Sequence, residues 1–255
     1  MEKYELAAQK FIDTCAFKDD ITAVFLTGSY AFDNADEYSD IDLLIVLDDK
    51  VDYRERGNLL VDGFLIEYFA NPVRQTKRYI NDNFETVQIH EINMILGGRV
   101  IYDKGKGCAD ELISFCKEKS LQNFPEMSDF ALKSSLYFLR YKLNELKRVH
   151  QADSADFAMH FYGFIKEIFA SYSRFCLCPV PQYQKLYKWL FDAEYFRNYG
   201  LPQHKDSEFI NMIKLAFGSE NKAEMFALAE KIYEHVIEKM GGFDINTYVL
   251  RSPCE

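Results

Sequence analysis

A short pattern near the N-terminus constrains this chain most: a Gly-Ser pair at 28–29 is followed, after ten residues, by Asp40-Ile41-Asp42. The run Ile21–Leu26 before the pair is apolar and rich in β-branched residues, which predicts a buried strand ending in a tight turn. Glycine lets a backbone approach an anion closely, and a serine that opens a helical turn offers its hydroxyl and N–H to the same anion. The pattern therefore predicts a phosphate-binding turn, with a triphosphate as the natural ligand.

The two aspartates begin a second predicted strand. After the polar, acidic segment Ala31–Ser39, the segment Asp40–Leu47 alternates carboxylates with apolar residues and then becomes wholly apolar. Because side chains alternate between the faces of a strand, Asp40 and Asp42 point the same way, with Cα atoms roughly 6–7 Å apart. Ile41 points into the core. Two carboxylates at this spacing are close enough to share a metal ion.

A third predicted strand carries a single acidic residue. Phe64–Phe69 follows the turn Asp62-Gly63 and contains Glu67 among apolar neighbours. If this strand pairs with Asp40–Leu47, Glu67 completes a cluster of three carboxylates. Taken singly, the Gly-Ser pair is an ordinary turn, Asp-x-Asp is a solvated loop, and Glu67 is an edge-strand residue facing water. The combination favours a catalytic site.

Together these residues resemble the signature of the DNA polymerase beta-like nucleotidyltransferase superfamily, over about Ile21–Asp103. The resemblance implies an α+β fold, with a small mixed β-sheet flanked by helices. It also implies Mg²⁺-dependent transfer of a nucleoside monophosphate from a triphosphate, with release of pyrophosphate. The residues that it implies for nucleotide binding are Gly28, Ser29 and Ser39, and those that it implies for catalysis and metal binding are Asp40, Asp42 and Glu67.

The chain also resembles the streptomycin/spectinomycin adenylyltransferases, and this leaves two roles open for Glu67. It is either a third metal ligand, as in the polymerases, or a general base that contacts the acceptor hydroxyl. One departure matters: many relatives have an arginine soon after the Gly-Ser pair, whereas residues 30–33 supply none. Another cation must then neutralise the phosphates.

Lys185 is the candidate for this missing cation. It lies in the segment VPQYQKLYKWL, which resembles a proline-then-lysine segment that precedes a tryptophan in some of those adenylyltransferases. The alternative is a solvated lysine on a short helix. Trp189, in the same segment, is expected in the core.

Composition indicates an intracellular enzyme acting on small molecules. The chain has 255 residues, 48% of them hydrophobic, and a formal net charge of −10. This length supports one large or two ordinary domains. A protein that grips a nucleic acid normally presents clustered Lys and Arg, and the nearest candidate, Lys142–Arg148, is mixed with Glu145 and apolar residues. We therefore expect no nucleic-acid partner.

Other sequence patterns bear on the cellular location of the protein and on whether its cysteines bind zinc. No stretch resembles a signal peptide or a membrane span, so a cytoplasmic monomer or homodimer without membrane contact is expected. The six cysteines lack paired Cys-x-x-Cys spacing, so reduced thiols are expected rather than zinc ligands. They lie at Cys15, Cys108, Cys116, Cys176, Cys178 and Cys254.

The periodicity predicts two domains, 1–122 and 126–255, separated near Pro125. In the first, helices are expected at 2–17, 72–83, 86–96 and 108–119, with a further strand at 99–102. The second is expected to be an α-helical bundle, with helices at 128–150, 155–176, 182–191, 208–217 and 222–240. This architecture resembles the antibiotic adenylyltransferases, in which a helical domain closes one side of the active-site cleft.

Two features of the second half suggest a function but have a simpler structural interpretation. Arg197 and His204 match the loose spacing of helical ribonuclease toxins, but Gly200 and Pro202 between them exclude one continuous helix. Aromatic residues at helical spacing between Phe157 and Phe169 are able to stack a flat ligand, yet this spacing favours a core seam.

The leading hypothesis is a Mg²⁺-dependent nucleotidyltransferase that moves AMP from ATP to a hydroxyl of a small molecule, with an aminoglycoside-like antibiotic as the named acceptor. The alternatives are adenylylation of a protein partner, as in antitoxin-like relatives, and a catalytically silent nucleotide-binding protein. The helical second half favours a self-contained cleft over a protein acceptor. The three carboxylates favour an enzyme over a silent relative.

Overall fold

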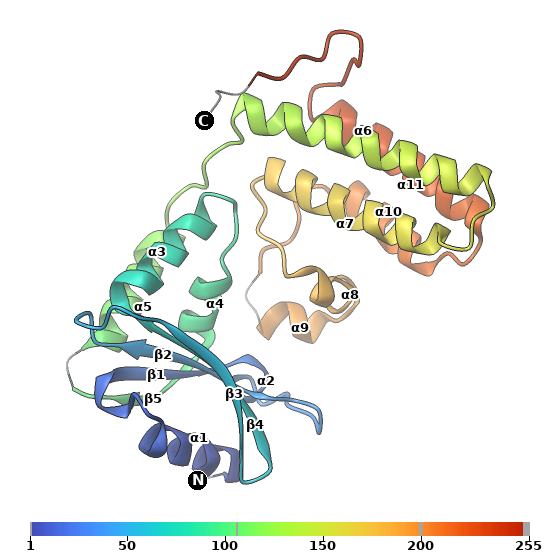
Figure 1. Ribbon diagram of the computed structural model, residues 1–255. Coiled ribbons are helices and arrows are strands. Elements are labelled where there is room, and N and C mark those ends of the chain that lie inside the picture. The colour runs from blue at the N-terminus through green and yellow to red at the C-terminus, as the bar shows by residue number, and fades with distance from the viewer. Residues whose placement is uncertain (1, 106, 199–200, 252–255) are drawn as a thin grey trace. The chain divides into compact units, whose positions relative to one another are not determined.

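The structure is a computed structural model that describes residues 2–105, 107–198 and 201–251 (Figure 1). The chain divides into two compact units, formed essentially by Met1–Asn123 and by Phe124–Arg197 with Leu201–Glu255. The first unit combines a mixed sheet with helices, and the second is helical. The predicted fold class is therefore confirmed.

A five-stranded sheet forms the centre of the first unit, in the order β3-β4-β2-β1-β5. The pair β2 and β4 is parallel, whereas the other neighbouring strands are antiparallel. The central strands are buried on both faces, as their continuous apolar sequences predict. The bounds are Ile21–Thr27 for β1, Ile41–Leu47 for β2, Glu55–Val61 for β3, Phe64–Pro72 for β4 and Arg99–Asp103 for β5.

Strand β3 is absent from the sequence-based prediction. It lies at the edge of the sheet and is mostly exposed, so its sequence lacks the apolar alternation of a half-buried strand. The turn Asp62-Gly63 joins it to β4, and both turn residues have positive φ, at 50° and 89°. Two residues of this kind are typical of a tight β-hairpin. The sequence predicts the turn but not the partner strand that the turn implies.

Helices cover both faces of this sheet (Figure 1). One face packs on α1 and includes the side chains of Ile41, Leu43 and Ile45. The other face packs on α3, α4 and α5. Since side chains alternate, Asp42 and Leu44 share this second face. The helices span Lys3–Thr14 for α1, Val73–Phe84 for α3, His90–Gly97 for α4 and Cys108–Ser120 for α5, while a single turn, Gly28–Ala31, forms α2.

One predicted helix starts later than expected. The sequence predicted a helix from Thr86, but α4 begins at His90. Residues 85–87 form turns instead, and Val87 has a φ of 60°, which a helix does not allow. The positive φ of a β-branched residue is not visible in the hydrophobic pattern from which the helix was predicted.

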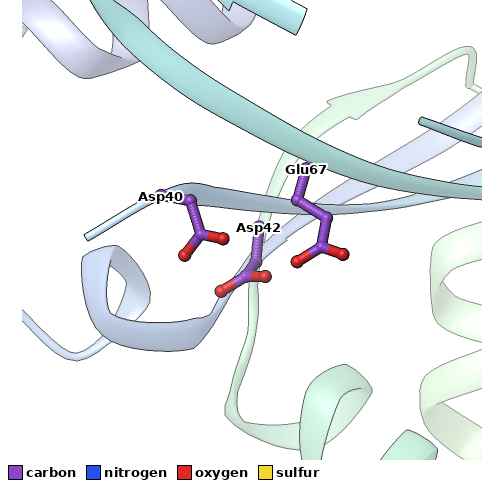
Figure 2. Close-up of side chains that lie close together, drawn as sticks. All are labelled: Asp40, Asp42 and Glu67. Carbon is purple, nitrogen blue, oxygen red and sulfur yellow. The ribbon is translucent and has the colours of Figure 1, made fainter. Parts of the chain in front are cut away.

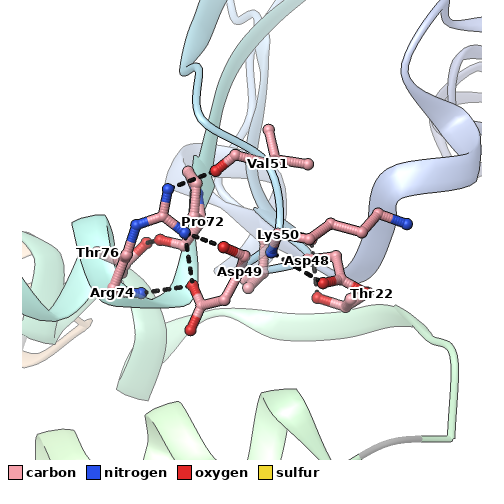
Figure 3. Close-up of polar contacts among 9 residues, drawn as sticks. Thr22, Asp48, Asp49, Lys50, Val51, Pro72, Arg74 and Thr76 are labelled. Atoms are coloured by element: carbon pink, nitrogen blue, oxygen red, sulfur yellow. Dashed lines mark hydrogen bonds and ion pairs between the residues drawn. The ribbon is translucent and has the colours of Figure 1, made fainter.

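Arg74 forms hydrogen bonds that hold the loop after β2 in place (Figure 3). Its backbone N–H donates to Asp49 Oδ1 at 2.9 Å, and its guanidinium donates to the backbone carbonyls of Asp49 and Val51. The guanidinium also lies 3.6 Å from the Asp49 carboxylate. The start of α3 therefore holds the loop between β2 and β3. This contact lies at one end of β2, and the aspartates lie at the other end.

The second unit packs its longest helices together: α6 on α7, and α11 on α6, α7 and α10. The predicted aromatic seam is confirmed for Phe157, Phe161, Phe164 and Phe169, which are buried, whereas its fifth member, Tyr162, is half-buried. Trp189 is buried as expected. In the described parts of the chain, every helix is too short or too polar to cross a membrane. The bounds are Asp129–Gln151 for α6, Phe157–Phe175 for α7, Leu186–Phe191 for α8, Ala193–Asn198 for α9, Ser207–Gly218 for α10 and Lys222–Lys239 for α11.

A polar network crosses the interior of this helical unit. The carboxylate of Asp206 accepts hydrogen bonds from Phe209 N–H at 2.9 Å, from Tyr172 Oη at 2.7 Å and from His235 Nε2 at 2.7 Å. Although burial alone raises the pKa of this carboxyl, these hydrogen bonds outweigh it and lower the pKa of Asp206 to about 2. The network joins α7, α10 and α11.

His204 belongs to the same interior. Its ring is 8% exposed, packs against Tyr172 and Phe209, and accepts the Asp206 N–H at Nδ1. Burial lowers its pKa. It follows helix α9, which ends at Asn198, so it does not share one helix with Arg197. Gly200 and Cys254, which the sequence analysis also named, lie outside the described residues.

Candidate functional site

Two neighbouring strands bring three carboxylates together. Asp40 immediately precedes β2, Asp42 is its second residue, and Glu67 lies on β4. The two strands pair in parallel, and Asp42 stands directly opposite Glu67 in the register. Figure 2 shows the three carboxylates directed into the same space. The strand pairing expected from the sequence is therefore confirmed, and it places Glu67 beside the aspartates.

The carboxylates are close enough to bind one cation. One oxygen from each of the three residues lies within 4.8 Å of the others, and all three residues are half-buried. Within the described parts of the chain, this is the one group of three or more acidic, histidine or cysteine side chains with such geometry. Two unit charges 4.8 Å apart repel by about 1 kcal/mol in water and about 3 kcal/mol at an effective dielectric constant near 20. A bound cation would relieve this repulsion.

Gly28 lies against the Asp42 carboxylate. It follows β1, whose last residue, Thr27, pairs with Asp42 across the sheet. The φ of Gly28 is +66°, and a Cβ built there would lie 1.9 Å from Asp42 Oδ2. Only glycine both adopts this conformation readily and leaves room for the carboxylate. The turn and the aspartate are therefore packed as one unit.

The two serines of the predicted site have different surroundings. Ser29 is half-buried in the first turn of α2, and its carbonyl accepts the backbone N–H groups of Phe32 and Asn34. The Ser39 hydroxyl accepts from Asp36 N–H and donates to Asp36 Oδ1, both at 2.9 Å. Ser39 thus closes the turn that leads into Asp40. Its nucleotide-binding role stays a prediction, as does that of Ser29.

Lys185 belongs to the helical unit. It ends the 3-10 turn Tyr183–Lys185 before α8, and its side chain is exposed. The predicted contact of Lys185 with phosphate stays a prediction.

Tyr68 fixes the strand that carries Glu67 from the opposite face of the sheet. Its ring packs against those of Phe11 and Phe17, with centroids 4.9 and 5.7 Å away. Its hydroxyl donates to Glu55 Oε1 at 2.7 Å, so β3 and β4 are also tied by side chains. Burial, together with this hydrogen bond, raises the pKa of Tyr68 to about 12. The position of Glu67 is therefore determined by a rigid, well-packed part of the sheet.

A match to a known protein family covers this site. Residues 8–121 match the family of nucleotidyltransferase domains, a range that includes all five strands and the three carboxylates. Comparison with curated proteins gives no match. Among solved structures, a nucleotidyltransferase-like protein from Exiguobacterium sibiricum 255-15 is 11% identical, with a TM-score of 0.49 over 92% of this chain and 75% of that one. The first unit matches the nucleotidyltransferase domain family over nearly its whole length, and this match supports a transferase that moves nucleotidyl groups.

Proposed function

We propose that this protein transfers AMP from ATP to a hydroxyl group of a small molecule and releases pyrophosphate, with Mg²⁺ bound by Asp40, Asp42 and Glu67. The observation that carries this proposal is the convergence of these three carboxylates within 4.8 Å, in a nucleotidyltransferase domain and against the turn at Gly28. Chemistry of this kind requires little from the protein beyond positioning and charge stabilisation.

The three carboxylates suit Mg²⁺. Magnesium prefers oxygen ligands, and in proteins it is commonly held by a few carboxylates together with phosphate oxygens of the substrate. One oxygen from each side chain is already near the others, and Gly28 leaves the space that Asp42 occupies. When bound, the ion supplies positive charge that orients the triphosphate and offsets the negative charge that builds up at phosphorus during transfer.

The chain's own residues then position the reactants. We propose that the backbone N–H groups and the Ser29 hydroxyl at the Gly28 turn bind the triphosphate, while Ser39 shapes the turn before Asp40. The acceptor hydroxyl attacks the α-phosphorus in line. A new bond forms from its oxygen to phosphorus, the bond from phosphorus to the α–β bridging oxygen breaks, and the electron pair leaves with pyrophosphate. Lys185 is proposed as the cation that neutralises the phosphates.

Glu67 has two candidate roles in this reaction. The distance of 4.8 Å or less between its oxygen and those of the aspartates supports a metal ligand. In this first case the proton of the acceptor hydroxyl passes to water. A general base must instead contact the acceptor hydroxyl and accept its proton. In the second case Asp40 and Asp42 alone hold the ion, and the hydroxyl proton moves to Glu67.

We propose a cationic, hydroxyl-bearing compound of the aminoglycoside type as the first acceptor to test. The net charge of −10 favours approach of a cation over that of an anion. We also propose the cytoplasm as the compartment, because ATP is available there and the described cysteines are free thiols.

The test is pyrophosphate release from each of the four ribonucleoside triphosphates with Mg²⁺, against a panel of aminoglycosides, lincosamides and other hydroxyl compounds. Wild type is compared with Asp42→Asn and with Asp33→Asn. Asp33 is an exposed aspartate in the connection between α2 and β2, with a φ of 54° that asparagine tolerates, so it is a matched control for loss of one charge.

We expect release that depends on one acceptor, that survives Asp33→Asn and that falls at least about a thousandfold in Asp42→Asn, because the carboxylate stabilises charge in the transition state. Metal-dependent nucleotide binding without release for any panel compound would contradict transfer to a small molecule. A protein acceptor or a catalytically silent nucleotide-binding protein would then be the better description.

A further inference from the structure

Strand β3 adds a neighbour to Glu67 that no sequence motif indicates. In the antiparallel pairing of β3 with β4, Asn58 stands directly opposite Glu67. Directly opposite residues of an antiparallel pair project from the same face, with Cβ atoms about 4.5–5.5 Å apart. Asn58 is exposed, so its side chain is free of the packing that would hold it away from this face. The amide is therefore within reach of the Glu67 carboxylate.

The two cross-strand neighbours of Glu67 differ in charge. On β2 the neighbour is Asp42, which repels a second carboxylate. On β3 it is Asn58, which is neutral and carries two N–H donors. Asn58 is thus placed to hold Glu67 in position from the side away from Asp42.

The other β3 residues on this face are committed elsewhere or have no donor. Arg56 stands opposite Phe69, and its guanidinium lies 5.0 Å from the centre of that ring. Leu60 stands opposite Leu65, and both are exposed, at 68% and 45%. Among the residues of β3 that share the face of Glu67, Asn58 is therefore the uncharged hydrogen-bond donor beside it.

We propose that Asn58 is a positioning residue for Glu67. With a cation bound, its Nδ2 amide would donate to one carboxylate oxygen of Glu67 and direct the other oxygen toward Asp40 and Asp42. The proposal rests on the proposed function, because it takes Glu67 as a ligand of the cation. Hydrogen-bonded partners of metal ligands fix the orientation of those ligands, and their loss commonly weakens metal binding by about 10–100-fold.

The experiment measures binding of Mn²⁺ alone to the full-length chain, from the electron paramagnetic resonance signal of the free ion. Three single variants are compared with wild type. Asn58→Leu removes the donor at similar volume, Asn58→Thr keeps a hydroxyl donor in a strand-forming residue, and Asn81→Leu makes the same change at an exposed position of α3. Circular dichroism verifies that each variant is folded.

We expect Asn58→Leu to weaken Mn²⁺ binding about tenfold, with most of the affinity restored by Asn58→Thr and none lost in Asn81→Leu. A double-mutant cycle tests whether Asn58 acts on metal binding through Glu67. In a Glu67→Gln background, Asn58→Leu should cause no further loss, because the carboxylate through which it acts is gone.

The outcomes separate this inference from the proposed function. If wild type binds no Mn²⁺, the metal site itself is wrong and the inference falls with it. If wild type binds Mn²⁺ but Asn58→Leu matches Asn81→Leu, the metal site stands and only the role of Asn58 is overturned. An equal loss with and without Glu67 would also overturn it, since Asn58 would then act by another route.

Discussion

Carboxylates gather next to one another in the first unit, whereas in the second unit a carboxylate is enclosed by hydrogen-bond donors. Asp40, Asp42 and Glu67 place oxygens within 4.8 Å of each other. Asp206, by contrast, accepts hydrogen bonds from a backbone N–H, a tyrosine and a histidine. Both groups are partly or largely buried, so burial alone does not distinguish them. The difference lies in the sign of the surrounding charges and dipoles.

The contrast separates a site kept for a ligand from a site that stabilises the fold. Clustered like charges raise the free energy of the folded protein, and this cost persists in evolution where a bound cation provides a function. A carboxylate surrounded by donors lowers the free energy of the folded state and needs no ligand. We therefore expect changes in the first group to affect activity more than stability, and changes in the second to do the reverse.

After loss of the carboxylate itself in Asp42→Asn, the largest effect is expected from Gly28→Ala. The new Cβ would lie 1.9 Å from Asp42 Oδ2, so either the carboxylate or the turn must move. Displacement of a catalytic group by about 1 Å commonly lowers rates about a hundredfold. We therefore expect kcat/KM for pyrophosphate release to fall by about a hundredfold or more, in the assay that tests the proposed function.

Gly63→Ala is the matched control for this prediction. Gly63 also has a positive φ, at +89°, but its turn leaves open space where a Cβ would be. Both variants therefore carry backbone strain, and only Gly28→Ala carries the collision. An equal loss of kcat/KM in the two variants would show that backbone strain, and not the packing of Gly28 on Asp42, causes the loss.

Asp206→Asn should produce the next largest effect, on stability. The pKa of Asp206 is lowered from 3.8 to about 2, which corresponds to about 2 kcal/mol of stabilisation from its ionised form at neutral pH. Because the folded-state pKa lies below the unfolded value, this stabilisation is complete above about pH 4 and is lost as the pH falls toward 2. The variant should therefore be less stable at pH 7 and approach wild type in acid.

Tryptophan fluorescence reports on the unit of the protein that contains Asp206. Trp189 is the single tryptophan of the chain, and it lies in the helical unit. Urea unfolding followed by its emission, at several pH values between 7 and 2, gives the difference in unfolding free energy between wild type and variant. A difference that stays constant down to pH 2 would contradict the assigned role of the ionised carboxylate. Pyrophosphate release by the folded variant should match wild type.

The sequence predicted the grouping of the three carboxylates better than the elements around them. Gly28, Asp40 and Asp42 are recognisable because short-range strand alternation and turn chemistry determine them. The proximity of Glu67 also followed once the two strands were assumed to pair, and the parallel register shows that they do. These features depend on residues close in sequence and on one pairing between continuous apolar strands, which hydrophobic patterns reveal well.

Asn58 and the Asp206 network were not predictable in the same way. Asn58 lies on an exposed edge strand whose sequence carries no apolar period, and the Asp62-Gly63 turn was the one signal that a partner strand precedes β4. The Asp206 network joins residues from three helices, so only the packed structure brings them together. Lone polar residues on helices and exposed strands carry no such information in a single sequence.

The smallest expected effect is stabilisation of the first unit by Mg²⁺. A ligand that binds only the folded state at ten times its Kd stabilises that state by about 1.4 kcal/mol. Relief of the repulsion among the three carboxylates should therefore slow hydrogen exchange in peptides covering 21–47 and 64–72, and leave peptides covering 157–175 unchanged. Exchange measured by mass spectrometry, with Mg²⁺ or with a chelator, provides the comparison.

In Asp42→Asn the repulsion is smaller from the start, so the metal-free protein should already exchange more slowly in 21–47 and respond less to Mg²⁺. Equal slowing in both units would show that the ion acts outside the carboxylate site.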